Sequence, residues 1–206
     1  MTPKMDKDPA LLSAASGRAL LRLARSTIAR KLGMPLTPDP GECDSLSETE
    51  ALQEKCGTFV TLKRQGELRG CIGSLVACES IVDGIRSNAI NAAFCDSRFP
   101  PLTREELPEV VLEISILSEP EPLTYADAED LLRKLRPGHD GVVIRKGALG
   151  ATFLPQVWEQ LPRPEDFLSH LCSKARLPAG SWRQGDLEVS TYTVQHFEEK
   201  PGETDR

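Results

Sequence analysis

The sequence lacks the features that mark membrane, secreted and nucleic-acid-binding proteins. No run approaches the roughly 20 apolar residues that a membrane span needs, and the charged segment 1–9 has no apolar core of the kind found in secretory signals. Lysine and arginine do not cluster, and the formal net charge is −6, which argues against binding to a phosphate backbone. We therefore expect a cytoplasmic protein that binds neither a membrane nor nucleic acid.

Short motifs typical of metal and cofactor sites are also missing. The six cysteines form no Cys-x-x-Cys pair, and no group of cysteine and histidine has the spacing of a zinc site. The chain has no phosphate-binding glycine-rich loop, no dinucleotide-binding fingerprint and no cysteine triplet of the radical-SAM type. The residues thus predict no metal and no cofactor. Cysteines without a secretory signal favour reduced thiols.

The composition is that of an ordinary globular protein. Of 206 residues, 39% are hydrophobic and 27% charged, which is enough to bury a core without disulfides. Predicted helices and strands alternate irregularly, and hairpins are frequent, which favours an α+β fold with a mixed, largely antiparallel sheet packed with helices. The predicted helices are 9–32, 79–94, 124–135, 155–161 and 164–175; a hairpin is predicted over 57–73 and strands over 110–117, 142–146, 149–153 and 187–197.

The hairpin over 57–73 is the most informative segment. Its turn is predicted at Gln65 and Gly66. If two residues form the turn, Val60 lies opposite Cys71, and strand alternation puts Arg69 on the same face as Cys71.

Cys71 is the candidate reactive thiol of this hairpin. A nearby cation favours the thiolate, so we expect the Arg69 guanidinium, about 7 Å along the strand, to reach the Cys71 sulfur. Gly70 and Gly73 would leave room for a substrate or for the backbone of a partner. The alternative is a buried cysteine that packs as a small apolar residue opposite Val60.

A catalytic thiol needs a general base, and His139 is the best candidate among the three histidines. It lies in a predicted turn, where a side chain can reach the mouth of a pocket, and Asp140 is next to it, either to orient it or to bind separately. The alternative is a solvated turn residue. His170 is predicted on the outer face of a helix and His196 at the periphery, so the sequence gives no complete arrangement of histidine with Cys71.

Two further segments are candidate binding positions. Asp96, Arg98 and Phe99 precede two prolines, so they form a rigid turn. This turn either holds a charge pair at a cleft or places Phe99 in the core beside a local ion pair. Gln156 begins a predicted helix, where its amide is suited to hydrogen-bond a ligand; the alternative is that this helix only packs Trp158 into the core or an interface.

The six residues Leu-Arg-Gly-Cys-Ile-Gly at 68–73 resemble the signature of the AMMECR domain, whose bacterial and archaeal members are called AmmeMemoRadiSam system protein A. Four further segments resemble the other motifs of this family in the same order, at 92–102, 113–118, 141–144 and 153–158. The resemblance spans residues 10–200. It implies a single AMMECR-type domain, a compact unit with a large and a smaller lobe. The charged segment 1–9 and the acidic segment 198–206 are predicted to be flexible termini.

The resemblance implies a pathway rather than a reaction. Prokaryotic members are similar to proteins encoded or fused beside a Memo-like protein and a radical-SAM protein. We therefore expect a Cys71-dependent step in the modification of a small molecule or a protein, with Memo-like and radical-SAM partners. The alternative is a non-catalytic adaptor whose glycine-rich strand binds another protein. A catalytic Cys71 should be alkylated much faster than Cys43, which is predicted to lie exposed on a loop.

Overall fold

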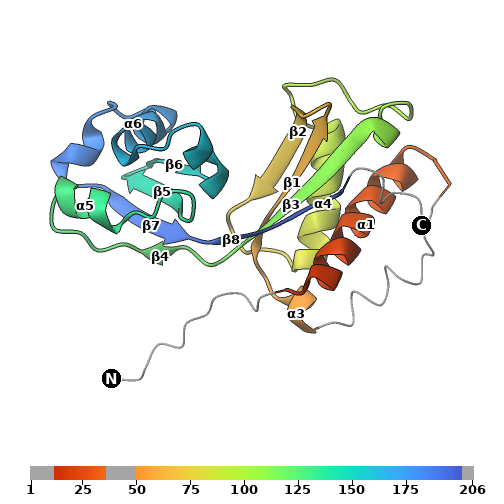
Figure 1. Ribbon diagram of the computed structural model, residues 1–206, viewed down its shortest axis with the longest axis horizontal. Helices are drawn as coiled ribbons and strands as arrows, with labels where there is room; N and C mark the ends of the chain where they lie inside the picture. The colour runs from red at the N-terminus through yellow and green to blue at the C-terminus, as the bar shows by residue number, and fades with distance from the viewer. Residues whose placement is uncertain (1–11, 36–49, 201–206) are drawn as a thin grey trace. The chain divides into compact units, whose positions relative to one another are not determined.

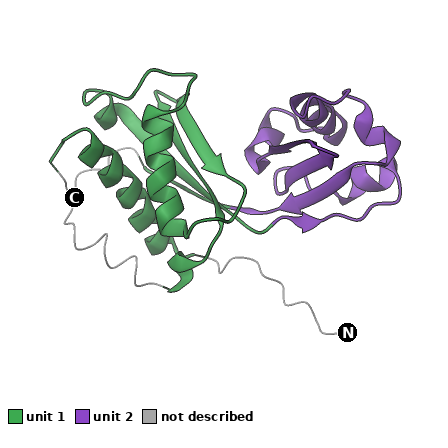
Figure 2. Cartoon of the chain, turned by 180° about the vertical axis from the view of Figure 1, so that it is seen from behind, with its two compact units in different colours: residues 1–119, 195–206 green, residues 120–194 purple. Residues whose placement is uncertain are grey.

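The chain folds into two units, each with its own four-stranded sheet. The computed structural model describes residues 12–35 and 50–200. Unit 1 contains Met1–Glu119 and Gln195–Arg206, and unit 2 contains Pro120–Val194 (Figure 2). The predicted terminus 1–9, most of the predicted terminus 198–206 and Cys43 lie outside the described residues.

Unit 1 packs helices α1 and α4 on one face of its sheet (Figure 1). The strands follow the order β2-β1-β3-β8, so β2 is an edge strand. The bounds are α1 Ala14–Lys31, α3 Glu50–Gln53, β1 Gly57–Arg64, β2 Glu67–Ser74, α4 Ile81–Phe94, η2 Leu107–Glu109, β3 Val110–Leu117 and β8 Val194–Glu198. Alternate strand residues, among them Val60 and Ile114, are fully buried beneath the helices. The opposite face of the sheet carries the residues between them.

Local sequence explains where the two helices begin. Ser13 caps α1 and accepts a hydrogen bond from the N–H of Ser16. Ser80 caps α4 in the same way, with Asp83 in the first turn, where a negative charge favours the helix dipole.

Unit 2 has the strand order β4-β7-β5-β6 and a separate core. Its elements are β4 Glu121–Pro122, α5 Ala128–Lys134, β5 Gly141–Lys146, β6 Leu149–Phe153, η3 Pro155–Glu159, α6 Pro164–Lys174, η4 Ser181–Gln184 and β7 Glu188–Tyr192. The ring of Phe167 is fully buried and stacks on Trp158, with 3.7 Å between the ring centroids.

The α+β class with antiparallel sheets is confirmed, but four predicted elements differ. The predicted strand 187–197 is two strands, since β7 pairs in the sheet of unit 2 and β8 in that of unit 1. The predicted helix 155–161 is the 3-10 helix η3. Helices α1 and α5 begin later than predicted, because Ser13 caps the first and Asp127 the second.

The hairpin turns where it was predicted. Gln65 and Gly66 form the two-residue turn, both with positive φ (54° and 82°), as a tight hairpin requires. The predicted register, however, is wrong by one residue, because Thr61 rather than Val60 lies opposite Cys71.

A β-bulge explains the shift in register. Leu62 pairs with Gly70 and Lys63 pairs with Leu68, so Arg69 is an extra residue in β2. A bulge interrupts the alternation of side chains between the two faces. The prediction that Arg69 and Cys71 share a face by alternation therefore rested on a regular strand that does not exist here.

Candidate functional site

Cys71 is half-buried on edge strand β2, where one side chain contacts its thiol and two contact its backbone. Its Sγ accepts a hydrogen bond from Thr61 Oγ1 across the hairpin, at 3.3 Å. The N–H of Cys71 donates to Asp96 Oδ2 at 2.9 Å, and its carbonyl accepts from Arg98 Nη2 at 3.2 Å. The two side chains thus satisfy the edge backbone where another strand would otherwise pair.

Asp96 and Arg98 form a tight ion pair beside Cys71. The buried Asp96 carboxylate accepts hydrogen bonds from Arg98 Nη2 at 2.7 Å and from Arg98 Nε at 2.9 Å. These bonds, with smaller contributions from the N–H groups of Cys71 and Arg98, hold the pKa of Asp96 well below its ordinary range. The pKa of Arg98 is raised, chiefly by the bond to Asp96 and, to a smaller extent, by the charge of a Cys71 thiolate. Arg98 is therefore a cation near the thiol.

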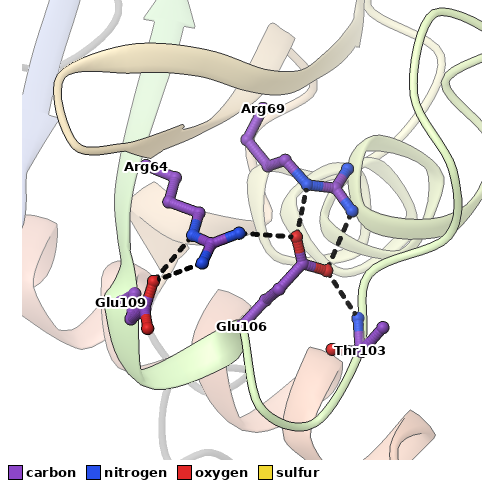
Figure 3. A network of polar contacts seen from close by, with 5 residues as sticks. All are labelled: Arg64, Arg69, Thr103, Glu106 and Glu109. Atoms are coloured by element: carbon purple, nitrogen blue, oxygen red, sulfur yellow. Dashed lines mark hydrogen bonds and ion pairs between the residues drawn. The ribbon is translucent and has the colours of Figure 1, made fainter.

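Arg69 belongs to a different network, drawn in Figure 3. Its Nε and Nη2 donate to the two oxygens of Glu106, each at 3.0 Å. Glu106 also accepts from Arg64 Nη1 at 3.3 Å and from the N–H of Thr103 at 3.0 Å. Arg69 is the main cause of the lowered pKa of Glu106. In the described part of the chain, no contact joins the Arg69 guanidinium to the Cys71 sulfur, so Arg69 fastens β2 to the segment before β3.

The space beside the two signature glycines is filled by the chain itself. A Cβ on Gly70 would lie 2.2 Å from the carbonyl oxygen of Ala92 in α4, and one on Gly73 would lie 2.2 Å from the ring of Phe59. Both distances are far below a van der Waals contact, so close internal packing explains the two glycines. The room that we expected for a substrate is, on this side of each residue, occupied.

The ring of Phe99 lies near both Arg98, the partner of Asp96, and Arg69, the partner of Glu106. This half-buried ring lies 5.5 Å from the Arg98 guanidinium carbon and 5.9 Å from that of Arg69. At these distances both cations are attracted to the ring.

A row of polar side chains crosses the unit 1 sheet on the face opposite α1 and α4. Thr61 lies opposite Cys71 on one side and opposite Glu113 of β3 on the other. Glu113 is buried; its Oε2 contacts the Lys63 ammonium, and its Oε1 lies 3.4 Å from His196 Nδ1. Sequence reasoning missed Thr61, Lys63 and Glu113 as site residues and placed His196 at the periphery. The available signal was a charged residue in the middle of an otherwise apolar strand.

The remaining candidates lie in unit 2. His139 is exposed in its turn, and its N–H donates to the carbonyl of Arg136. Asp140 is buried and accepts from Arg136 N, Nε and Nη2, so it stabilises that turn. Gln156 Oε1 is buried and accepts no hydrogen bond from the described residues. Because Cys71 lies in unit 1, its pairing with His139 stays a prediction.

Residues 12–35 and 50–200 contain neither a metal-binding cluster nor a membrane-spanning helix. There, no three His, Cys, Asp or Glu side chains gather closely enough to hold a metal ion. Within the same ranges, no helix combines the length and the apolar character that crossing a bilayer requires.

The fold and the site define an α+β protein with a glycine-rich edge strand, on which a hydrogen-bonded cysteine is held by an aspartate–arginine pair. The AMMECR1 family model matches residues 21–197, and the chain therefore belongs to this family.

The similar proteins agree with this assignment over nearly the whole chain. A protein of Thermofilum pendens is 37% identical, covering 91% of this chain and 92% of its own length. A protein of Methanosarcina barkeri is 38% identical, with 92% and 93% covered. The crystal structure of the uncharacterized protein PH0010 from Pyrococcus horikoshii superimposes with a TM-score of 0.78 at 34% identity, covering 92% of this chain and 94% of that one.

Proposed function

We propose that this protein uses the Cys71 thiol as a nucleophile or group acceptor in the modification of a small molecule or a protein. The observation that carries the proposal is the hydrogen bond from Thr61 Oγ1 to Cys71 Sγ, at 3.3 Å. A cysteine that only fills space needs no such donor, whereas a thiolate is stabilised by one. In the reaction, the thiolate attacks an electrophilic carbon, and the leaving group departs with the electron pair of the broken bond.

Two polar side chains, Thr61 and Arg98, contact Cys71, and their expected effects on its reactivity differ. The Thr61 hydroxyl points directly at the sulfur in a half-buried position, where hydrogen bonds are stronger than in water. The Arg98 guanidinium contacts the carbonyl of Cys71, but its side chain is 54% exposed, so solvent screens its charge. Thr61 is therefore the main activating residue in this proposal, and Arg98 assists.

The cellular setting is proposed from family resemblance. The protein would act in the cytoplasm with Memo-like and radical-SAM partners, one of which supplies or consumes the group that Cys71 carries. Asp96, Arg98 and Phe99 would position Cys71, while His139, Asp140 and Gln156 are candidates for contacts with substrate or partner.

A non-catalytic adaptor is the second candidate. Two large apolar side chains, Leu68 at the start of β2 and Val76 just after its end, are exposed. Such residues can anchor a partner protein. Against this reading, the β2 backbone at Cys71 is already satisfied by Asp96 and Arg98, so an added strand would have to displace them.

Alkylation by iodoacetamide at neutral pH, followed by peptide mass spectrometry, tests the proposal. Cys78 and Cys95 are exposed and serve as ordinary references. Burial raises the pKa of the Cys56 and Cys172 thiols, so these two should react slowly. Cys71 should react faster than all four although it is half-buried. A Cys71 rate as low as that of Cys56 and Cys172 would refute the enzyme proposal and favour the adaptor.

A further inference from the structure

A charged cluster on the face that carries Thr61 takes no part in the proposed thiol chemistry. We call Lys63, Glu113, His196 and Glu198 the His196 cluster. Glu113 Oε1 lies 3.4 Å from His196 Nδ1, its Oε2 contacts the Lys63 ammonium, and Lys63 Nζ lies 3.4 Å from Glu198 Oε1. The Glu113 side chain is 7% exposed, whereas that of His196 is 37% exposed. A buried carboxylate thus lies behind an accessible imidazole.

This arrangement is the one that prepares a histidine for acid–base chemistry. A carboxylate 3.4 Å from Nδ1 favours a proton on that nitrogen, which leaves the lone pair of the neutral imidazole on Nε2. Within residues 12–35 and 50–200, no hydrogen bond involves His196 Nε2. Lys63 keeps its charge beside the carboxylate, since its contact with Glu113 is the main cause of its raised pKa.

Strand docking does not explain the cluster, because other contacts already fix this end of the chain. Glu199 accepts from Arg25 Nε at 2.7 Å and from the N–H of Leu112 at 2.8 Å. The ring of Phe197 fills the space that a side chain on Gly17 would need. Burying a charge costs free energy even when it is paired. Since other contacts already hold β8, holding this strand does not explain why a carboxylate is buried at Glu113.

We propose that His196 is an acid–base residue of a second site in unit 1. Its Nε2 accepts a proton from a hydroxyl or amine group of a ligand bound on this face, the resulting imidazolium lies beside the Glu113 carboxylate, and the reverse step returns the proton. Two carboxylates face one ammonium in the cluster, so the site favours a neutral or cationic ligand.

This site is distinct from the thiol. Cys71 and Glu113 lie two interstrand spacings apart, about 10 Å, with Thr61 between them. His196 lies beyond Glu113 on β8, so it does not take the proton of Cys71 directly.

The first test is the tautomer of His196, measured by 15N NMR on the full chain at about pH 8.5, where an ordinary histidine is neutral. His139 and His170 are exposed and act as internal references. We expect the proton of His196 on Nδ1. A proton on Nε2 would overturn the proposal, and because this measurement uses the wild-type chain, it does not depend on the folding of a variant.

The second test uses diethylpyrocarbonate, an acylating probe of imidazole nitrogen, with rates read for each histidine by mass spectrometry. Glu113→Gln keeps the shape of the side chain and removes its charge. At about pH 8.5, where an ordinary imidazole is neutral, we expect the rate at His196 to fall by about threefold, with His139 and His170 unchanged. The cause is the replacement of a charge-assisted contact to the Nδ1–H by a weaker, neutral one. An unchanged rate at His196 would contradict the proposal. Neither test involves Cys71, so failure here is distinguishable from failure of the thiol proposal.

Discussion

Replacing Arg69 with alanine separates a structural role of this signature residue from a role at the thiol. The Arg69 side chain is 10% exposed and forms two hydrogen bonds with Glu106, which is 18% exposed (Figure 3). If these bonds fasten β2 to the segment before β3, Arg69→Ala should destabilise unit 1. It should leave the alkylation of Cys71 unchanged, because the guanidinium does not contact the sulfur.

The expected loss in the free energy of unfolding depends on the partners that Glu106 keeps in Arg69→Ala. Removing one partner of a buried ion pair costs about 3–5 kcal/mol. Here Glu106 retains Arg64 and the N–H of Thr103, so we expect a loss of about 2–3 kcal/mol. About 0.5–1 kcal/mol of this would come from the lost contact with the ring of Phe99.

The assay is urea unfolding followed by circular dichroism, with Arg86→Ala as the control. Arg86 makes an exposed ion pair with Asp83 at 3.5 Å, so its removal should cost about 0–0.5 kcal/mol. Hydrogen exchange of peptides from β2 assigns the loss to unit 1, because amides of a loosened strand exchange faster. Both tryptophans lie in unit 2, so fluorescence follows that unit separately.

The stability difference between wild type and Arg69→Ala should depend on pH with a definite sign. The pKa of Glu106 is lower in the folded chain than in the unfolded one, chiefly because of Arg69. The contribution of Glu106 to folding stability is therefore complete above its pKa in the unfolded chain, about 4.3. It is lost as the pH falls through its lower pKa in the folded chain. The difference in stability between wild type and Arg69→Ala should hold from neutral pH to about pH 5 and shrink below about pH 4. A loss no larger than that of Arg86→Ala, or slower alkylation of Cys71 in a variant of normal stability, would refute this reasoning.

Two further substitutions probe the packing and charge around Cys71. Gly70→Ala should lower the free energy of unfolding in urea by about 1–3 kcal/mol, because the new Cβ would lie 2.2 Å from Ala92 O. The control Gly180→Ala should be nearly neutral, since the nearest atom to its new Cβ lies at 3.6 Å. Equal effects of the two substitutions would contradict the close packing at Gly70. Asp96→Asn should cost about 1–3 kcal/mol by thermal unfolding at neutral pH. The Arg98 contact lowers the pKa of Asp96 in the folded chain. The stability cost of the substitution should therefore be complete above about pH 4 and disappear as the pH falls through the depressed pKa of the folded state. A cost that persists in strong acid would contradict this role of the Asp96 charge.

Local signals predicted the α+β class and the hairpin turn, but not the register. Gln65 and Gly66 were recognisable because a tight turn between two apolar runs needs residues that tolerate positive φ. Gly70 is a residue type that often marks a bulge, but no local pattern shows that Arg69 is the extra residue or that it bonds to Glu106, 37 positions away in the sequence. One extra residue in β2 then changed both the partner of Cys71 and the role of Arg69.

The candidate site was only partly visible for the same reason. Cys71, Asp96 and Arg98 were predicted as site residues, but no pattern linked the carboxylate of Asp96 to the N–H of Cys71. Thr61 and His196 gain their significance from strand pairing, which brings β1 and β8 to either side of β3. The break after β7 was hidden, since 187–197 is continuously strand-like and only tertiary pairing divides it between two sheets.

The most direct test of the account is the alkylation rate of Cys71 relative to Cys78 in wild type and in Thr61→Val. Valine keeps the shape of threonine and removes the donor to the sulfur. A hydrogen bond worth about 1 kcal/mol corresponds to about a fivefold change in rate. The account predicts that Cys71 is the faster thiol in wild type and that this advantage falls by about that factor in Thr61→Val. A wild-type Cys71 slower than Cys78, or an advantage that survives the substitution, would contradict it.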